Sequence, residues 1–163
     1  MLGFVESSGY LVGTYVRDKD AVVTSMILAE MASELKKQSK TIIDRLNEIY
    51  DEFGLCDHYV FSYKFAGDVG HKKMYEILDG LRVNHKDSFG TIKVLKEKDY
   101  LEGLEGLPKS NILIYNLESD IEIIIRPSGT EPLIKVYVNL NEDKRSNAKN
   151  LKIIKAEIDA MMN

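Results

Sequence analysis

The stretch Ile121-Glu122-Ile123-Ile124-Ile125-Arg126-Pro127-Ser128-Gly129-Thr130-Glu131-Pro132-Leu133-Ile134-Lys135-Val136-Tyr137-Val138 predicts two strands joined by a polar loop. The runs 121–125 and 133–138 are apolar and rich in β-branched residues, which favour strands. The seven residues between them include two prolines, which stiffen the loop and keep the flanking strands from running through it. A strand–loop–strand unit is therefore expected near the C-terminal end of the chain.

The loop in this unit has a composition suited to phosphate. Arg126 offers a planar fork of donors, and Ser128 and Thr130 add hydroxyl groups. Gly129 has no side chain, so backbone N–H groups can approach an anion closely. The alternative is a polar hairpin turn with a solvated Arg126. Composition alone favours that alternative.

Around this unit the chain alternates between strand and helix patterns. Residues 59–65 alternate like a strand, and residues 67–70, with two glycines, are expected to form a loop. Residues 72–82 have a helical apolar face, and residues 91–95 are expected to form a strand. Strands are expected at 112–117, 121–125 and 133–140, and a closing helix over 142–161. This order predicts an α+β fold, with an antiparallel sheet and helices on one face.

The first part of the chain has a different pattern. A strand over 10–16 precedes a helix capped by Asp20, with an apolar stripe of Val23, Ile27, Met31 and Leu35. A second helix is expected to begin near Thr41, where Asp44 completes a capping box. One strand and one helix cannot bury a core alone, so we expect residues 1–56 to be the tail of an α/β domain plus a connecting helix. Residues 57–163 form the second expected domain.

The overall composition is that of a soluble globular protein, with 44% hydrophobic and 29% charged residues. No apolar run approaches the ~20 residues that span a bilayer, so no membrane partner is expected. The net charge of −4 argues against nucleic acid as a partner. Cys56 is the single cysteine, which fits a reducing cytoplasm. It is expected to be a structural thiol.

No metal site is expected from the sequence. His58, His71 and His85 lack metal-ligand spacing, and helix capping explains Asp20 in the Asp18–Asp20 pair. Neither of the common glycine-rich nucleotide-binding motifs occurs. The aromatic stripe of 59–65 is expected to be sheet core rather than a platform for stacking bases.

Three short stretches then line up in order. They are Gly3-Phe4-Val5-Glu6-Ser7-Ser8-Gly9-Tyr10, Arg17-Asp18-Lys19-Asp20 and the Arg126–Pro132 loop with its continuation to Tyr137. Together they resemble the C-terminal part of the α-D-phosphohexomutases, the bacterial phosphoglucomutase/phosphomannomutase group in particular. The resemblance covers essentially the whole chain, and its most specific motif is the loop.

The resemblance implies a four-domain enzyme with its last domain at residues 57–163. That domain is expected to have a TATA-box-binding-protein-like fold, with an antiparallel sheet flanked by helices. Arg126, Ser128, Gly129 and Thr130 match the residues that hold the phosphate group that is not transferred. The third domain of the family supplies a sugar-contacting Glu-x-Ser loop and a lysine near the active site. Ser7 matches that serine, and Lys19 matches that lysine in a supporting catalytic role.

One residue departs from the family pattern. Val5 occupies the position of the sugar-contacting glutamate, and valine cannot accept hydrogen bonds from sugar hydroxyls. Glu6 is the candidate substitute for sugar binding, beside Ser7. The alternative for Glu6 is a solvated loop charge, and that for Lys19 is a solvated lysine at a helix start.

The resemblance also implies partners and cofactors. The substrate would be a phosphorylated hexose, and the intact enzyme would need Mg²⁺ and hexose 1,6-bisphosphate. The phosphorylated serine and the Asp-rich metal loop of the family have no match here, so the sequence is interpreted as a C-terminal fragment that works with the missing N-terminal domains. Such a fragment is expected to bind neither cofactor alone and to be inactive. The rival interpretation is a standalone phosphate-binding module.

Overall fold

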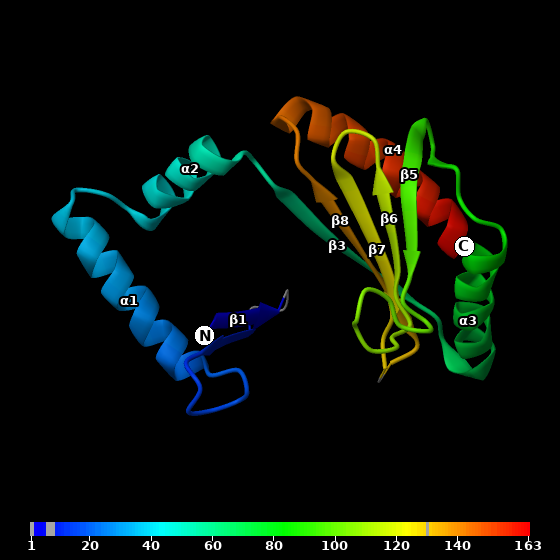
Figure 1. Cartoon of the computed structure of the whole chain (residues 1–163), viewed down its shortest axis with the longest axis horizontal. Coiled ribbons are helices and arrows are strands. Elements are labelled where there is room, and N and C mark those ends of the chain that lie inside the picture. Colours follow the sequence, from blue (N-terminus) through cyan, green and yellow to red (C-terminus); the bar gives the residue numbers. More distant parts are fainter. Residues whose placement is uncertain (1, 6–8, 130) are drawn as a thin grey trace. The chain divides into compact units, whose positions relative to one another are not determined.

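The chain divides into two units, Met1–Phe53 and Gly54–Asn163. The computed structural model describes residues 2–5, 9–129 and 131–163, and Figure 1 shows its helices and strands. The division follows Phe53, whereas the sequence pattern placed it after residue 56. Each unit is described separately below.

The first unit contains a short hairpin and two helices. Strands β1 (Leu2–Val5) and β2 (Gly9–Val12) pair antiparallel. Helix α1 spans Ala21–Lys37 and α2 spans Ile42–Phe53. The strand expected over 10–16 therefore ends at Val12, before Gly13 adopts a positive φ of 82°. The sequence pattern did not predict β1.

Both helix starts of the first unit were predicted correctly from local chemistry. The Asp20 carboxylate accepts hydrogen bonds from the backbone N–H groups of Val22 (2.9 Å) and Val23 (3.2 Å). In α2, Asp44 Oδ2 accepts from the Thr41 N–H (2.7 Å), and the Asp44 N–H donates to Thr41 Oγ1 (3.1 Å). These bonds lower the pKa of both aspartates, that of Asp20 chiefly through the Val23 N–H and that of Asp44 chiefly through the Thr41 N–H.

Two of the four residues in the apolar stripe of α1 are exposed. Leu35 is the one buried residue among residues 2–5 and 9–53, while Ile27 is 37% and Met31 39% exposed. Helix α2 has no buried residue. The helical periodicity was thus predicted correctly, but within the described part of the chain few side chains cover this apolar face.

The second unit is built on an antiparallel six-stranded sheet with the order β3-β8-β7-β6-β5-β4. The strands are β3 (Asp57–Lys64), β4 (Ser88–Phe89), β5 (Ile92–Asp99), β6 (Leu113–Leu117), β7 (Ile121–Pro127) and β8 (Leu133–Leu140). The helices are α3 (Gly67–Val83) and α4 (Lys144–Met162). The expected α+β fold with an antiparallel sheet is confirmed.

Alternate strand residues and one side of each helix form the core of this unit. On β6 and along Ile121–Ile125 of β7 the buried positions recur at every second residue, as in Leu113, Tyr115 and Leu117 of β6. Met74 and Leu78 of α3 and Ile154 and Ile158 of α4 join the same cluster and are fully buried. The aromatic residues Tyr59, Phe61 and Tyr63 of β3 pack against it, as predicted.

Several boundaries in this unit differ from the sequence prediction, among them the start of α3 and the end of β7. Helix α3 begins at Gly67, so residues 67–70, which were expected to be a loop, form its first turn. Strand β7 continues through Arg126 and Pro127, so both belong to the strand and not to the loop. Arg126 is therefore placed by the pairing of strands, opposite Lys135 of β8.

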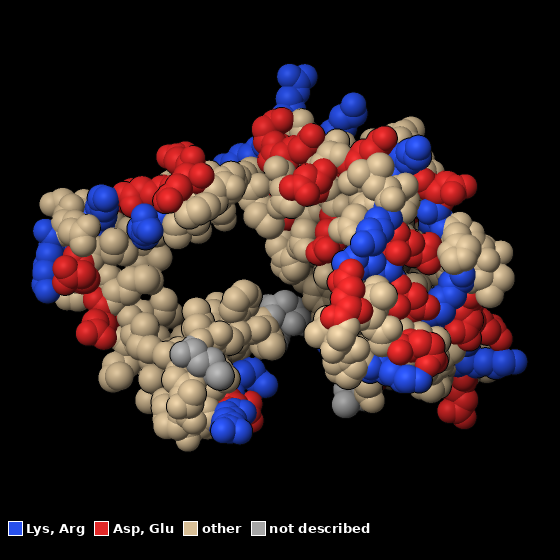
Figure 2. Space-filling view, in the orientation of Figure 1, with Lys and Arg blue, Asp and Glu red and all other residues tan. Residues whose placement is uncertain are grey.

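Charges of both signs alternate over the second unit on the face shown in Figure 2. Ion pairs account for part of this pattern, for example Lys98 with Glu105 (3.0 Å). None of the described helices is long and apolar enough to cross a membrane.

Candidate functional site

The loop after β7 lies at one end of the sheet. Pro127 pairs with Ile134, and the Ser128 N–H donates to the Leu133 carbonyl (2.8 Å), which closes the base of the loop. The connection between β5 and β6 lies at the same end (Figure 1). This follows from the register, because Leu113 at the start of β6 pairs with Ile125 near the end of β7.

Arg126 is exposed on the sheet face opposite the core. Its neighbour Ile125 is fully buried, and successive side chains of a strand point to opposite faces. The guanidinium carbon lies 5.8 Å from the centre of the Tyr137 ring, which orients it through a cation–π contact. Among the described residues, no carboxylate forms an ion pair with Arg126. Its charge is thus not neutralised by a described neighbour.

The other loop residues supply polar groups beside Arg126. Ser128 is half-buried, and its hydroxyl oxygen accepts a hydrogen bond from the Glu131 N–H (3.3 Å). Gly129 is exposed, and a Cβ added there would meet no atom within 4 Å. Crowding therefore does not require this glycine. Thr130, the fourth predicted phosphate ligand, lies outside the described residues.

Three of the predicted phosphate ligands line one pocket of about 320 Å³. One side of this pocket consists of Arg126 and Pro127 at the end of β7 and of Ser128 and Gly129 in the loop that follows. The other side consists of residues that the sequence analysis did not single out: Tyr75 of α3 and Ser110, Asn111 and Ile112 before β6. No local motif marks that second wall, because strand pairing and helix packing bring it to the loop.

The second wall is fixed by hydrogen bonds. The Ser110 N–H donates to the Tyr100 carbonyl (2.8 Å), and the Tyr100 N–H donates to the Ile112 carbonyl (3.0 Å). The Arg82 guanidinium binds Asp99 (3.0 Å) and Asn111 (2.5 Å). The pocket therefore combines the Arg126 loop with a wall that is tied to α3.

The first unit holds the remaining predicted site residues. Lys19 lines a pocket of about 220 Å³ together with Val5, Gly9 and Asp18. The Lys19 ammonium lies 3.4 Å from an Asp18 carboxylate oxygen, and both side chains are well exposed. Glu6 and Ser7, the predicted sugar ligands, lie outside the described residues.

In the second unit three predicted site residues line one pocket, whereas in the first unit Lys19 is the one predicted site residue among the described residues. Lys19 shares a pocket with Val5, the residue that departs from the family pattern. The Lys19 stem lies close to Gly9, where an added Cβ would stand 2.2 Å from the Lys19 Cδ. Arg126 shares the other pocket with Ser128 and Gly129.

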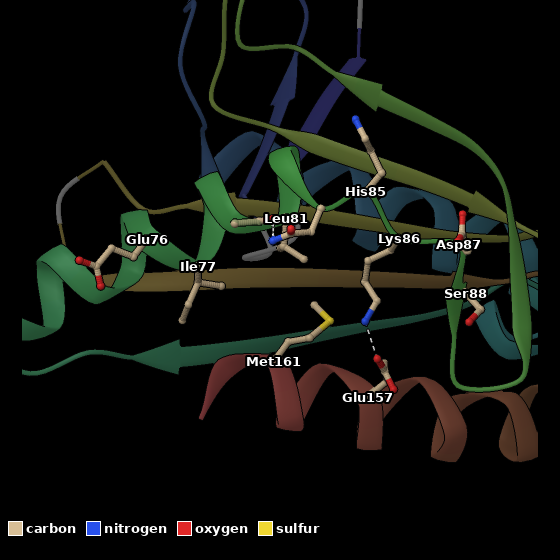
Figure 3. A pocket seen from close by; sticks show the side chains of 11 residues that line it. Glu76, Ile77, Leu81, His85, Lys86, Asp87, Ser88, Glu157 and Met161 are labelled. Carbon is tan, nitrogen blue, oxygen red and sulfur yellow. Dashed lines mark hydrogen bonds and ion pairs between the residues drawn. The ribbon is translucent and has the colours of Figure 1, made fainter.

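A larger pocket of about 450 Å³ lies between α3, α4 and the segment before β4 (Figure 3). Its side chains include Ile77 and Met161 as well as Lys86 and Glu157, which form an ion pair with each other. Lys86 also lies 5.4 Å from the centre of the Phe89 ring. Because this cation is paired inside the protein, the pocket is a weaker candidate for an anion than the one beside Arg126.

The three histidines make contacts of other kinds. His58 Nδ1 lies 2.5 Å from Asn139 Oδ1, His71 packs edge-on against Tyr75, and His85 Nδ1 lies 3.2 Å from Glu97. Among the described residues, no group of three or more His, Cys, Asp or Glu side chains is placed to hold a metal ion.

Comparison with known proteins found relatives over most of the chain. It is 37% identical over 151 residues to a phosphoglucomutase of Staphylococcus aureus (strain USA300), which covers 86% of this chain and 27% of that protein. It is 34% identical over 154 residues to a phosphoglucomutase of Staphylococcus haemolyticus (strain JCSC1435), covering 88% and 28%. The chain thus spans under a third of the length of these relatives.

A solved structure shares the fold. The open form of the exocytosis-sensitive phosphoprotein pp63/parafusin from Paramecium, a phosphoglucomutase, superposes with a TM-score of 0.63 at 20% identity. The superposition covers 96% of this chain and 29% of that one.

A family comparison matches residues 30–152 to the phosphoglucomutase/phosphomannomutase C-terminal domain. The matched segment includes the sheet, α3 and the Arg126 loop. Because it spans more than half of the residues, the chain belongs to the phosphoglucomutase/phosphomannomutase family.

Proposed function

We propose that this chain is the C-terminal part of a mutase that interconverts hexose 1-phosphate and hexose 6-phosphate. Membership of the family supports the reaction class, and phosphoglucomutases are among the relatives. The division of labour is also part of the proposal: residues 1–56 belong to a third domain and its connecting helix, and residues 57–163 form the fourth, phosphate-binding domain.

The loop of the second unit is proposed to hold the phosphate that is not transferred. The observation that carries this role is Arg126, a guanidinium without a described carboxylate partner. It lies at the end of β7 and lines a pocket together with Ser128 and Gly129 of the following loop. A planar fork of N–H donors matches two phosphate oxygens at once. Thr130 is assigned to the same site from the sequence motif.

Such a site fits a reaction through a bisphosphorylated intermediate. The intermediate must turn over between the two phosphoryl transfers, so one site has to accept either phosphate of the sugar. A loop that recognises the phosphate and not the sugar meets that requirement. Positioning and electrostatics supply most of the rate enhancement in phosphoryl transfer, and this loop would supply part of the positioning.

The first unit is proposed to contribute to the reacting end. Lys19 would add positive charge there, and Glu6 and Ser7 would contact the sugar. Val5 presents an apolar side chain in the pocket of Lys19, 40% exposed, where the family places a carboxylate. Mg²⁺ and hexose 1,6-bisphosphate would be bound by the intact enzyme, which would act in the cytoplasm.

An NMR titration of the full chain with glucose 6-phosphate tests the phosphate site. We expect backbone amide signals of residues 126–130 to shift, with weak affinity, because a single loop supplies few of the contacts of a closed cleft. The variant Arg126→Ala should lose most of these shifts. Arg145→Ala is the matched control, because Arg145 lies in the first turn of α4, after the opposite end of β8.

Equal shifts in the wild type and in Arg126→Ala would reject the phosphate site.

A mutase assay addresses the wider proposal, because the isolated chain should be inactive. The rival standalone module predicts the same titration, so the genomic sequence upstream discriminates between them. A Ser-His-Asn-Pro loop and an Asp-rich metal loop encoded there support the mutase, and the absence of both would reject it.

A further inference from the structure

Asn111 stands in the wall that faces the predicted phosphate loop. It lines the pocket of about 320 Å³ with Arg126, Ser128 and Gly129, although it is 15 positions away from Arg126 in the sequence. Strand pairing explains this proximity, because Leu113 of β6 and Ile125 of β7, which are close in sequence to Asn111 and Arg126, are paired residues. A carboxamide can donate two hydrogen bonds through its nitrogen and accept through its oxygen.

Arg82 fixes which end of this carboxamide is free. Its guanidinium NH2 group donates to Asn111 Oδ1 at 2.5 Å, and its Nε donates to Asp99 Oδ2 at 3.0 Å. The Arg82 side chain is only 12% exposed, so this geometry is held inside the protein. An amide whose oxygen is bound to a guanidinium presents its N–H donors on the other side.

Arg82 itself is not placed as an anion ligand. Asp99 and Asp79 both lie within ion-pair distance, at 3.0 and 3.5 Å, and its charge is therefore compensated. Asp99 Oδ1 also accepts the Leu101 N–H at 3.0 Å, which fixes the start of the loop that leads to Asn111. This cluster thus acts on the pocket through Asn111.

We propose that Asn111 is a further ligand of the phosphate group in this pocket, and that Arg82 is the residue that positions it. The carboxamide Nδ2 donates to a phosphate oxygen from the side opposite Arg126. The ligand class is a phosphate monoester or inorganic phosphate. The inference rests on the proposed function of the loop, and it adds a neutral donor that the family motif does not contain.

The test uses the full chain and inorganic phosphate, followed by NMR. In the wild type the side-chain N–H signals of Asn111 should shift on titration. Asn111→Ala should weaken the affinity about tenfold, as expected for one hydrogen bond to a charged group. Asn116→Ala is the matched control on β6, because its Nδ2 donates to Glu122 (3.3 Å) and it does not line the pocket.

Arg82→Lys tests the positioning role. Lysine keeps the charge but loses the planar fork of N–H donors. The Asn111 amide should therefore lose its fixed orientation, and the affinity for inorganic phosphate should fall. The double variant Arg82→Lys/Asn111→Ala should bind no more weakly than Asn111→Ala alone, because both changes remove the same contact. Additive losses would overturn the positioning role.

The outcomes separate this inference from the proposed function. If Arg126→Ala abolishes binding while Asn111→Ala leaves it unchanged, the loop binds phosphate and the role of Asn111 is rejected. If the wild type shows no shift at residues 126–129, both proposals fail. If the wild type binds phosphate but the side-chain N–H signals of Asn111 do not shift, Asn111 is rejected as a ligand, and no variant is needed for this result.

Discussion

At the scale of single residues, Gly70 shows that a glycine can mark close packing within a helix. The sequence Gly67-Asp68-Val69-Gly70 suggested a loop, yet Gly70 lies in the first turn of α3. A Cβ at Gly70 would stand 2.5 Å from the carbonyl carbon of Phe65. The glycine therefore permits the helix to begin directly against the end of β3.

Replacing Gly70 by alanine should destabilise the second unit although alanine favours helices. The clash with the Phe65 backbone requires a shift of the main chain, for which overpacking costs of about 1–3 kcal/mol are typical. Gly80→Ala is the matched control in the same helix, since a Cβ there meets nothing within 4 Å. It should raise the free energy of unfolding by roughly 0.5–1 kcal/mol. Urea unfolding of both variants measures the difference, and a stabilised Gly70→Ala would contradict the packing argument.

The residues of the candidate site fall into two groups: those within one short sequence motif and those that only the fold brings to it. Arg126, Ser128 and Gly129 stand in one short motif, so their residue types sufficed to single them out. Tyr75 and Asn111 come from α3 and from the β5–β6 connection, and only the pairing of β6 with β7 brings Asn111 to the loop. Such a wall has no local pattern that a sequence could reveal.

At the scale of elements, α4 depends on its N-terminal cap. The Asp143 carboxylate accepts hydrogen bonds from the N–H groups of Arg145 (2.9 Å) and Ser146 (3.2 Å) and from the Ser146 hydroxyl (2.7 Å). The same helix buries Ile154 and Ile158 in the core. Fraying at the cap is therefore coupled to the packing of the sheet.

Asp143→Ala should lower the melting temperature, and Asp143→Asn should lower it less, because asparagine keeps a cap acceptor. The bond from the Ser146 hydroxyl is the main cause that lowers the pKa of Asp143 in the folded protein. A lowered folded pKa gives stability that is present above the unfolded value of about 3.9 and is lost as the pH falls through the folded pKa. The difference in melting temperature between the wild type and Asp143→Asn should therefore become smaller at acidic pH. Thermal melts between about pH 6 and pH 2 measure it, and a constant difference would contradict the charge contribution.

Elements were predictable where local chemistry and periodicity agree. Asp20 and the Thr41–Asp44 pair fixed two helix starts, and the aromatic alternation of β3 was confirmed by its packing. Strand β1 was missed because four residues carry too short a pattern. Strand β7 extends through Pro127 because its pairing with β8 continues to Ile134, which no property of residues 121–127 alone shows.

At the scale of the whole chain, the two units differ in how much apolar surface they bury. The second unit holds a cluster drawn from β3 to β8 and from α3 and α4, with Ile123, Val138 and Ile158 fully buried. In residues 2–5 and 9–53, burial is confined to Leu35. Since local opening free energies follow buried apolar contacts, the two units should differ in amide protection.

Hydrogen exchange followed by mass spectrometry should show this difference directly. Amides of β6, β7 and β8 should exchange slowly, and those of α1 and α2 much faster.

Ile158→Ala should reduce the stability of the second unit by about 2–5 kcal/mol, because it leaves a cavity in the core. In this variant the amide protection of the second unit should fall, while that of α1 and α2 stays unchanged. Ile49→Ala is the matched control, since Ile49 is 37% exposed on α2 and its loss should stay within roughly 0.5 kcal/mol. Equal loss of protection in both units on Ile158→Ala would instead show that they unfold as one, so that their stability could not be assigned to separate cores.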